Sequence, residues 1–174
     1  IRPYPEEYVT ERKMKDGTPV VLRPIKPEDE PMWHELLGSC STQSLWFRFS
    51  YLFKQTTHEM ATRYCFIDYD RELGIVAEVE EDGQRKLIGV GRLVADANHE
   101  AAEYAVIVVD RWHGHGLGGL LTDYCFEVAK HWGVKRVVAE VSKDNNRMLA
   151  TFRNRGFELN EDQEDVVLAS KPVE

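Results

Sequence analysis

The residues of this chain best suited to chemistry form a glycine-rich segment, His113-Gly114-His115-Gly116-Leu117-Gly118-Gly119, between an apolar stretch and a long amphipathic one. Glycine lets a backbone approach a ligand closely, and the first N–H groups of a helix have no partner within the helix. Those groups point at an anion placed at the helix start. The pattern therefore predicts a strand, a turn and a helix, with the turn holding phosphate groups.

Three kinds of phosphate-binding turn have this composition. A P-loop is excluded, because Gly118-Gly119 is followed by Leu120 instead of the Lys-Ser/Thr ending. A dinucleotide-binding fingerprint is disfavoured, because Gly114-x-Gly116-x-Gly118 lacks the G-x-G-x-x-G spacing and lies past the middle of the chain. The third kind fits: His113 to Gly118 resembles the Gln/Arg-x-x-Gly-x-Gly/Ala pyrophosphate loop of the GNAT acetyltransferases.

A second segment extends this resemblance. Residues Asn145 to Phe157 are similar to the downstream segment of the same family, which starts with Asn and ends in Gly-Phe, and the two segments occur in the family's order. The likeness covers roughly residues 18–170. It implies the GNAT acyl-CoA N-acyltransferase fold, an α/β fold with a mixed, mostly antiparallel central sheet and flanking helices. It also implies acetyl-CoA as the co-substrate.

Short strings near the start carry a narrower resemblance, namely Pro3-Tyr4-Pro5, Asp16-Gly17, Leu22 to Asp29, and Arg48-Phe49. They look like the acetyltransferase module of bacterial protein-lysine acetyltransferases of the Pat type. That likeness implies a protein substrate with a reactive lysine, an acyl-CoA synthetase being one candidate partner. Because the chain does not begin with Met, we expect a module of a longer polypeptide, with an arm or linker at 1–17 and the GNAT domain at 18–174.

The GNAT resemblance also implies cofactor contacts. Backbone N–H groups of the turn would bind the pyrophosphate, which assigns that contact to Gly114, His115, Gly116, Leu117, Gly118 and Gly119. Backbone groups of the preceding strand would pair with the pantetheine arm like an added strand, which assigns that contact to Ile107, Val108 and Val109. Asn145 matches the position that reaches the CoA arm, although an Asn there is also typical of a helix cap.

The turn departs from the family pattern at two histidines. His113 and His115 stand where Gln or Arg is usual. A metal pair is disfavoured, because two ligands without a nearby carboxylate or Cys rarely suffice, and we expect no metal. We expect solvent-facing histidines near phosphate, whose protonation would strengthen cofactor binding below about pH 6.5.

An amine must be neutral to attack a thioester, and neutralising a lysine of pKa about 10.4 at pH 7 costs roughly 4–5 kcal/mol. Glu103 is the candidate general base, because it opens the apolar strand where the resemblance implies a catalytic glutamate. A carboxylate needs burial or a relaying water for that task. The competing interpretation is a solvated Glu at a strand end, and Glu100 and Asp110 are weaker candidates on either side.

The family's frequent general acid is a tyrosine, whose position falls on Phe152. Phenylalanine cannot donate a proton, so that role is vacant. A thiolate of pKa about 8.5 is a tolerable leaving group near neutral pH. Water or Ser142 could supply the proton, and the residues do not decide between them.

The elements that must position these residues follow from periodicity and turn signals. Asp82-Gly83 between apolar runs predicts a hairpin, and Gly89 and Gly91 in its second strand indicate a bulge or a close approach. Aromatic residues from 45 to 53 indicate a core-facing helix, part of which could wall a substrate groove. We expect strands at 18–23, 73–79, 86–95, 104–109, 134–141 and, as an edge, 166–169, and helices at 27–38, 41–53, from 56, 116–132 and 144–154, with strands 104–109 and 134–141 parallel.

Composition excludes several classes. The 174 residues suit one core, and the formal charge of −8 argues against nucleic-acid binding. No apolar run reaches the roughly 18 residues of a membrane span. Cys40, Cys65 and Cys125 have no CxxC spacing, which indicates reduced thiols and a cytoplasmic protein.

The two resemblances together imply an acetyl-CoA-dependent N-acetyltransferase that transfers directly to a protein lysine with Glu103 as base. Two alternatives stay open. A small-molecule amine could be the acceptor, because one fold hosts many acceptors. Alternatively, Phe152 in place of tyrosine could mark a module that senses acetyl-CoA without catalysis.

Overall fold

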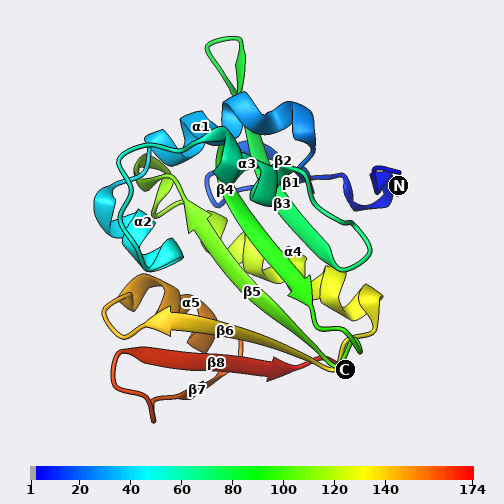
Figure 1. Ribbon diagram of the computed structural model, residues 1–174, viewed down its shortest axis with the longest axis vertical. Helices are drawn as coiled ribbons and strands as arrows, with labels where there is room; N and C mark the ends of the chain where they lie inside the picture. The colour runs from blue at the N-terminus through cyan, green and yellow to red at the C-terminus, as the bar shows by residue number, and fades with distance from the viewer. Residues whose placement is uncertain (1–2) are drawn as a thin grey trace.

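The computed structural model describes residues 3–174, which form an eight-stranded sheet with helices on both faces (Figure 1). The strand order is β1-β2-β3-β4-β5-β6-β8-β7. β5 and β6 pair in parallel, and the other neighbouring pairs among the described residues are antiparallel, so the expected mixed sheet is confirmed. The strands are β1 (Thr10–Lys13), β2 (Pro19–Pro24), β3 (Glu72–Glu81), β4 (Gln84–Ala95), β5 (Ala101–Val108), β6 (Arg136–Ser142), β7 (Glu158–Asn160) and β8 (Val166–Pro172).

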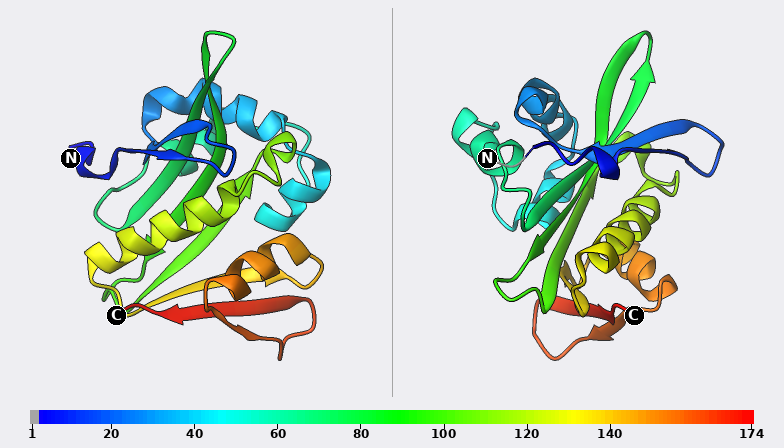
Figure 2. Two further views of the ribbon diagram at one scale, coloured as in Figure 1. Left: turned by 180° about the vertical axis from the view of Figure 1, so that it is seen from behind. Right: turned by 90° about the vertical axis from the view of Figure 1, so that its right-hand side faces the viewer.

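The helices divide between the two faces of this sheet (Figure 2). One face carries α1 (Glu30–Gly38), α2 (Thr42–Phe49) and α3 (His58–Cys65), and the other carries α4 (Leu117–Trp132) and α5 (Asn146–Asn154). Short 3-10 turns are η1 (Glu6–Tyr8), η2 (Pro27–Asp29) and η3 (Asp110–Trp112). Tyr104 of β5 packs in the core on the α4 face, and Ile107 of the same strand packs in the core on the α1–α3 face. This double burial explains why the strand is apolar on both sides.

The β3–β4 hairpin turns at Asp82 and Gly83, which have φ of 51° and 75° as a two-residue hairpin turn requires. The strand register shifts between Ala77 and Glu78, so a bulge is present. Gly89 also permits a close approach, because a Cβ there would lie 3.1 Å from the Leu121 side chain of α4. Both interpretations of the strand glycines therefore hold.

Several element bounds differ by a few residues, β5 for example beginning at Ala101 and not at 104, and two differences are larger. The C-terminal strand is not an edge: β8 lies between β6 and β7, and β7 forms the edge. The sequence pattern missed β7 because three polar-rich residues carry no periodicity. The helix expected to reach residue 53 ends at Phe49, because Ser50 takes the left-handed conformation at φ 59°.

The stretch 1–17, expected as an arm, contains a strand of the sheet. Its residues 1–2 lie outside the described part of the chain, and β1 pairs with β2 from Thr10 opposite Leu22 to Lys13 opposite Pro19. Met14 is buried in the core on the α4 face. The second half of this stretch thus packs on the domain.

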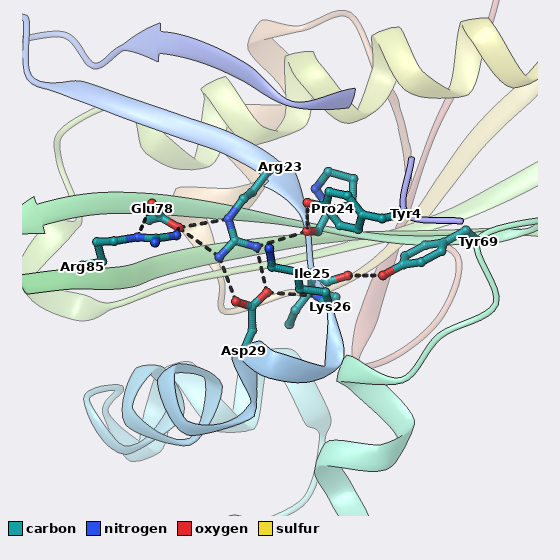
Figure 3. A network of polar contacts seen from close by, with 9 residues as sticks. All are labelled: Tyr4, Arg23, Pro24, Ile25, Lys26, Asp29, Tyr69, Glu78 and Arg85. Atoms are coloured by element: carbon teal, nitrogen blue, oxygen red, sulfur yellow. Dashed lines mark hydrogen bonds and ion pairs between the residues drawn. The ribbon is translucent and has the colours of Figure 1, made fainter. Parts of the chain in front are cut away.

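Buried ion pairs join β2, β3 and the start of α1 (Figure 3). Arg23 donates to both carboxylate oxygens of Asp29, at 2.7 and 2.8 Å, and to Glu78 at 2.9 Å. Burial favours neutral Glu78, but hydrogen bonds from Arg85 and Arg23 outweigh it and hold its pKa below the ordinary value. The Arg23 network therefore keeps its charges compensated inside the fold.

Two tyrosines attach neighbouring segments to the same place. The Tyr4 hydroxyl donates to the Pro24 carbonyl at 2.6 Å, and the Tyr69 hydroxyl donates to the Ile25 carbonyl at 2.7 Å (Figure 3). The string from Leu22 to Asp29, which resembles the Pat-type module, thus has a structural function in this chain.

Candidate active site

The active-site region begins where two neighbouring strands part. β5 pairs with β6 only from Ala101 to Glu103 among the described residues, opposite Arg136 to Val138. Beyond that point β6 continues beside β8, and β5 continues alone on this side. An unpaired strand edge exposes N–H and C=O groups that an extended ligand can use.

The hydrogen bonds around β5 show which residues face this open edge. The Val109 N–H donates to the Ile88 carbonyl, toward β4, at 2.9 Å. Because successive residues of a strand point their backbone groups to opposite edges, Val108 and Val106 face the open side. The Val108 carbonyl accordingly accepts a hydrogen bond from His113 Nε2 at 2.9 Å. Of the expected residues Ile107, Val108 and Val109, this register leaves Val108 facing the open edge and adds Val106 as a candidate for backbone pairing.

Three adjoining hollows follow the open edge, and we call them together the groove. One of about 270 Å³ lies toward the glycine-rich turn and is lined by His113 and Asn145. Another of about 310 Å³ is lined by Glu103. A smaller one of about 40 Å³ shares residues with both, and Phe47 and Arg48 of α2 line all three. The groove therefore connects the glycine-rich turn with Glu103.

The glycine-rich turn has the expected conformation. Gly114 and Gly116 have φ of 83° and 80°, a region that glycine adopts without strain. α4 begins at Leu117, so the N–H groups of Leu117, Gly118 and Gly119 lack acceptors within the helix, and no side chain among residues 3–174 caps them. The turn can present these groups to an anion.

The two glycines of the first helical turn have different surroundings. A Cβ on Gly118 would meet nothing nearer than the Met148 sulfur at 3.9 Å. A Cβ on Gly119 would collide with the guanidinium of Arg155, whose Cζ would lie 2.6 Å away. Arg155 is held there by Asp123, which accepts a hydrogen bond from its Nε at 2.8 Å. Gly119 therefore makes room for Arg155.

The two histidines of the turn were expected to face solvent, but both are half-buried. His113 donates to the Val108 carbonyl, and His115 Nδ1 lies within hydrogen-bond distance of the Trp112 and His113 carbonyls, at 3.2 and 3.1 Å. Both rings thus stabilise the turn through hydrogen bonds to backbone carbonyls. In the described part of the chain, no group of three or more His, Cys, Asp or Glu side chains is arranged to hold a metal ion.

Lys15 reaches the turn from the N-terminal stretch, a contact that sequence reasoning missed. Its N–H donates to the His115 carbonyl at 3.3 Å, and its side-chain carbons lie 3.0–3.3 Å from where a Cβ on Gly116 would be. No local pattern could indicate this contact, because the two segments are far apart in sequence. It places a flexible cation beside the predicted phosphate site.

Asn145 forms the expected helix cap and also lines the groove. Its Oδ1 accepts a hydrogen bond from the Met148 N–H at 3.3 Å and so caps α5. The same residue lines the groove on the side of the turn. Since the cap uses only the oxygen, the amide nitrogen is left for a ligand.

Glu103 is exposed and lies at the last residue where β5 and β6 pair. Its carboxylate has no hydrogen-bond or ion-pair partner in residues 3–174, so it is open to a proton from solvent or substrate. Glu100, in contrast, pairs with Lys135 at 3.4 Å.

Asp110 serves a structural role. Its carboxylate accepts hydrogen bonds from the Ser41 N–H, the Ser41 hydroxyl and the Ser44 hydroxyl, at 2.8, 2.8 and 3.0 Å. Burial would raise the pKa of Asp110, but these bonds hold it below the ordinary value. Asp110 thus ties η3 to the start of α2 and is a poor proton acceptor.

Phe152 is part of the core, at 2% exposure. Its ring meets Tyr104 edge-on at 6.1 Å and Phe157 at 4.8 Å between centroids. The Tyr104 hydroxyl is hydrogen-bonded to Thr122 at 3.0 Å, and burial raises its pKa. Neither ring offers a proton to the groove.

Comparison with known proteins agrees with this geometry. A model of the acetyltransferase (GNAT) family matches residues 33–157. The chain is 28% identical over 152 residues to acetyltransferase PA5475 of Pseudomonas aeruginosa, covering 87% of this chain and 82% of that protein.

Two solved structures share the fold. The GNAT domain of S. lividans PAT is 24% identical with a TM-score of 0.88, covering 98% of this chain and 99% of that one. RimL, a ribosomal L7/L12 alpha-N-protein acetyltransferase in complex with coenzyme A, is 15% identical with a TM-score of 0.71, covering 88% and 94%.

Proposed function

This chain belongs to the GNAT family of acetyltransferases, which transfer an acetyl group from acetyl-CoA to an amine, and we propose that its acceptor is the side-chain amine of a protein lysine. The observation that carries the proposal is an open groove that leads from the glycine-rich turn to Glu103, whose carboxylate has no partner among residues 3–174. Trp46 and Leu52 lie on and just after α2, which lines the groove, and are 48% and 66% exposed. Exposed apolar side chains near a site suit a macromolecular acceptor.

The cofactor contacts are part of this proposal. The pyrophosphate of acetyl-CoA binds at the N–H groups of the turn from Gly114 to Gly119, and Lys15 adds a positive charge there. The pantetheine arm pairs with the open edge of β5 at Val106 and Val108, and Asn145 reaches it from the start of α5. Acetyl-CoA supplies an activated acyl group as its thioester.

Glu103 is the proposed general base. It accepts the proton of the attacking amine, directly or through one water, as the nitrogen bonds to the acetyl carbon and the thiolate leaves. Its place where β5 and β6 part supports this role, because an arm that paired with β5 from the glycine-rich turn onward would bring its thioester end toward that point.

Replacement of the base tests this assignment. Glu103→Gln keeps the shape of the side chain and removes its basicity, so kcat with saturating lysine substrate should fall by about 10²–10⁴-fold. Acetyl-CoA affinity, measured by calorimetry, should not change. Glu100→Gln is the matched control, since that side chain pairs with Lys135. Wild-type kcat in Glu103→Gln would show that another group accepts the proton.

The acceptor is identified by incubating the protein with a cell lysate and isotopically labelled acetyl-CoA, followed by mass spectrometry. Label on lysine side chains of proteins supports the proposal, and an acyl-CoA synthetase is one candidate among them. Label confined to N-termini or small amines contradicts it.

The setting we propose is the cytoplasm. Cys40, Cys65 and Cys125 are free thiols, as is usual in a reducing compartment. No helix among residues 3–174 is long and apolar enough to span a membrane.

A further inference from the structure

Arg48 is a charged side chain of the groove that no other described residue neutralises. It lines all three hollows and is only partly exposed. Its guanidinium lies 4.7 Å from the ring centroid of Phe49 and 5.9 Å from that of Tyr64, and within residues 3–174 it has no hydrogen-bond or ion-pair partner. A cation withdrawn from water without a counter-charge is costly unless a ligand supplies one.

Arg92 of β4 adds a second guanidinium beside it. The Tyr64 ring lies 5.0 Å from Arg92, so both arginines contact the same ring. Arg92 donates to Glu72 at 2.9 Å, but its Nε is buried and has no hydrogen-bond partner among residues 3–174. Burial, and then the charge of Arg92, lower the pKa of Arg48. The described residues thus leave one positive charge and one buried N–H donor without a partner near Tyr64.

The acidic residues of the same hollow form no ion pair with Arg48 within residues 3–174. Glu103 and Glu140 line the 310 Å³ hollow with Arg48 and Arg92 but make no ion pair with them. Elsewhere the chain pairs its buried guanidinium fully, since Arg23 contacts two carboxylates at 2.7–2.9 Å. Among residues 3–174, Arg48 therefore differs from the buried Arg23, because it has no carboxylate partner.

We propose that Arg48, with Arg92 beside it, binds a carboxylate of a substrate in the hollow next to Glu103. A guanidinium presents parallel N–H donors that match a carboxylate in two-point contact, which Lys cannot reproduce. The subsite rests on the proposed acetyl transfer, because it adjoins the proposed base. It selects substrates that carry an anion near the reacting atoms.

The carboxylate has two sources with the same chemistry. It belongs either to the acceptor, as an acidic residue next to the reactive lysine, or to the acyl group, as in a dicarboxylic acyl-CoA. The two are distinguished by varying one substrate while the other is held constant.

The test measures discrimination ratios in the 174-residue chain. In the acceptor arm, lysine peptides with a flanking Glu or Gln are compared with acetyl-CoA as donor. In the donor arm, succinyl-CoA and acetyl-CoA are compared with one peptide. Equilibrium binding of each peptide and each acyl-CoA is measured alongside kcat/KM, so that the subsite is tested even where no lysine peptide is acetylated and the proposed function fails.

We expect the wild-type chain to prefer the carboxylate by about tenfold or more in one arm, as for a charged two-point hydrogen bond. Arg48→Gln should bring that ratio near one, Arg48→Lys should restore part of it, and Arg63→Gln, on the exposed side of α3, should leave it unchanged. A ratio near one in both arms of the wild type overturns the proposal. An Arg48→Gln variant that keeps the wild-type ratio overturns it too. If that variant only has a lower melting temperature, Arg48 packs against the aromatic rings and does not bind a carboxylate.

Discussion

Gly118 and Gly119 show at the scale of single residues how one motif combines two requirements. Gly118 is in the first turn of α4, where its N–H lacks an acceptor within the helix, and a Cβ there would meet nothing nearer than the Met148 sulfur at 3.9 Å. Gly119 lies against the guanidinium of Arg155, which also donates to the Thr151 carbonyl at 3.2 Å. The second glycine of the pair is therefore explained by packing between α4 and the end of α5.

Alanine substitutions should separate these two requirements. Gly118→Ala should raise the free energy of unfolding by about 0.5–1 kcal/mol, because alanine loses less backbone entropy in a helix. Gly119→Ala should be less stable than Gly118→Ala by about 1 kcal/mol, because Arg155 must leave its position and its bond to Asp123. Urea denaturation of both variants measures the difference.

The same pair has an internal control. In an Arg155→Ala background the obstacle at Gly119 is gone, so Gly119→Ala should stabilise the protein as Gly118→Ala does. A persistent penalty in that background would show that some contact other than Arg155 requires the glycine.

At the scale of elements, the start of α5 links helix stability to the groove. Asn145 accepts the cap bond from Met148 and faces the hollow beside the turn. A cap and a ligand contact make different demands on a side chain. The cap needs an oxygen, whereas a contact through the amide needs the nitrogen.

Two substitutions of Asn145 distinguish the demands. Asn145→Ala should cost about 1 kcal/mol of stability because the cap is lost, while Asn145→Ser should keep most of it. Both should weaken acetyl-CoA binding by about 2–10-fold, as expected for one lost hydrogen bond. Calorimetry and thermal unfolding of the two variants check this. If Asn145→Ser binds acetyl-CoA as the wild type does, Asn145 acts only as a cap.

At the scale of the whole molecule, the Arg23 network joins parts of the chain that are distant in sequence. Arg23 on β2, Asp29 before α1 and Glu78 on β3 meet inside the fold, and Glu78 also accepts from Arg85 at 2.9 Å (Figure 3). Charges buried together stabilise only while each is compensated. The stability of the domain should therefore depend on the ionisation of Glu78.

The sign of that dependence follows from the pKa of Glu78, which is lower in the folded chain than its ordinary value of 4.5. The folded state then binds fewer protons than the unfolded state, so the stabilisation is complete above about pH 4.5 and is lost as the pH falls through the folded pKa. Glu78→Gln should destabilise the chain by about 1–3 kcal/mol at pH 7. The difference in free energy of unfolding between the wild type and Glu78→Gln should shrink as the pH falls toward 3.

Denaturant titrations across this pH range measure the gap. Glu80→Gln is the control, because Glu80 is exposed on the same strand and has no ion-pair partner among the described residues. A pH-independent gap for Glu78→Gln would show that its charge does not stabilise the network.

The sequence by itself determined the elements whose signals are local. The Asp82-Gly83 turn, the stripe of α4 with Gly133 after it, and the caps at Ser41 and Thr57 were predictable, because helix periodicity, caps and positive φ depend on near neighbours. The family motifs added the fold class and the glycine-rich turn, both of which the structure confirms.

Only the tertiary structure decided what depends on contacts between distant segments. It placed β8 inside the sheet, turned Val106 and Val108 to the open edge, and brought Lys15 onto Gly116. It also left Arg48 without a hydrogen-bond or ion-pair partner in the described part of the chain, which its neighbours in sequence could not reveal. These features follow from strand order and from burial, and both are set by the packing of the whole chain.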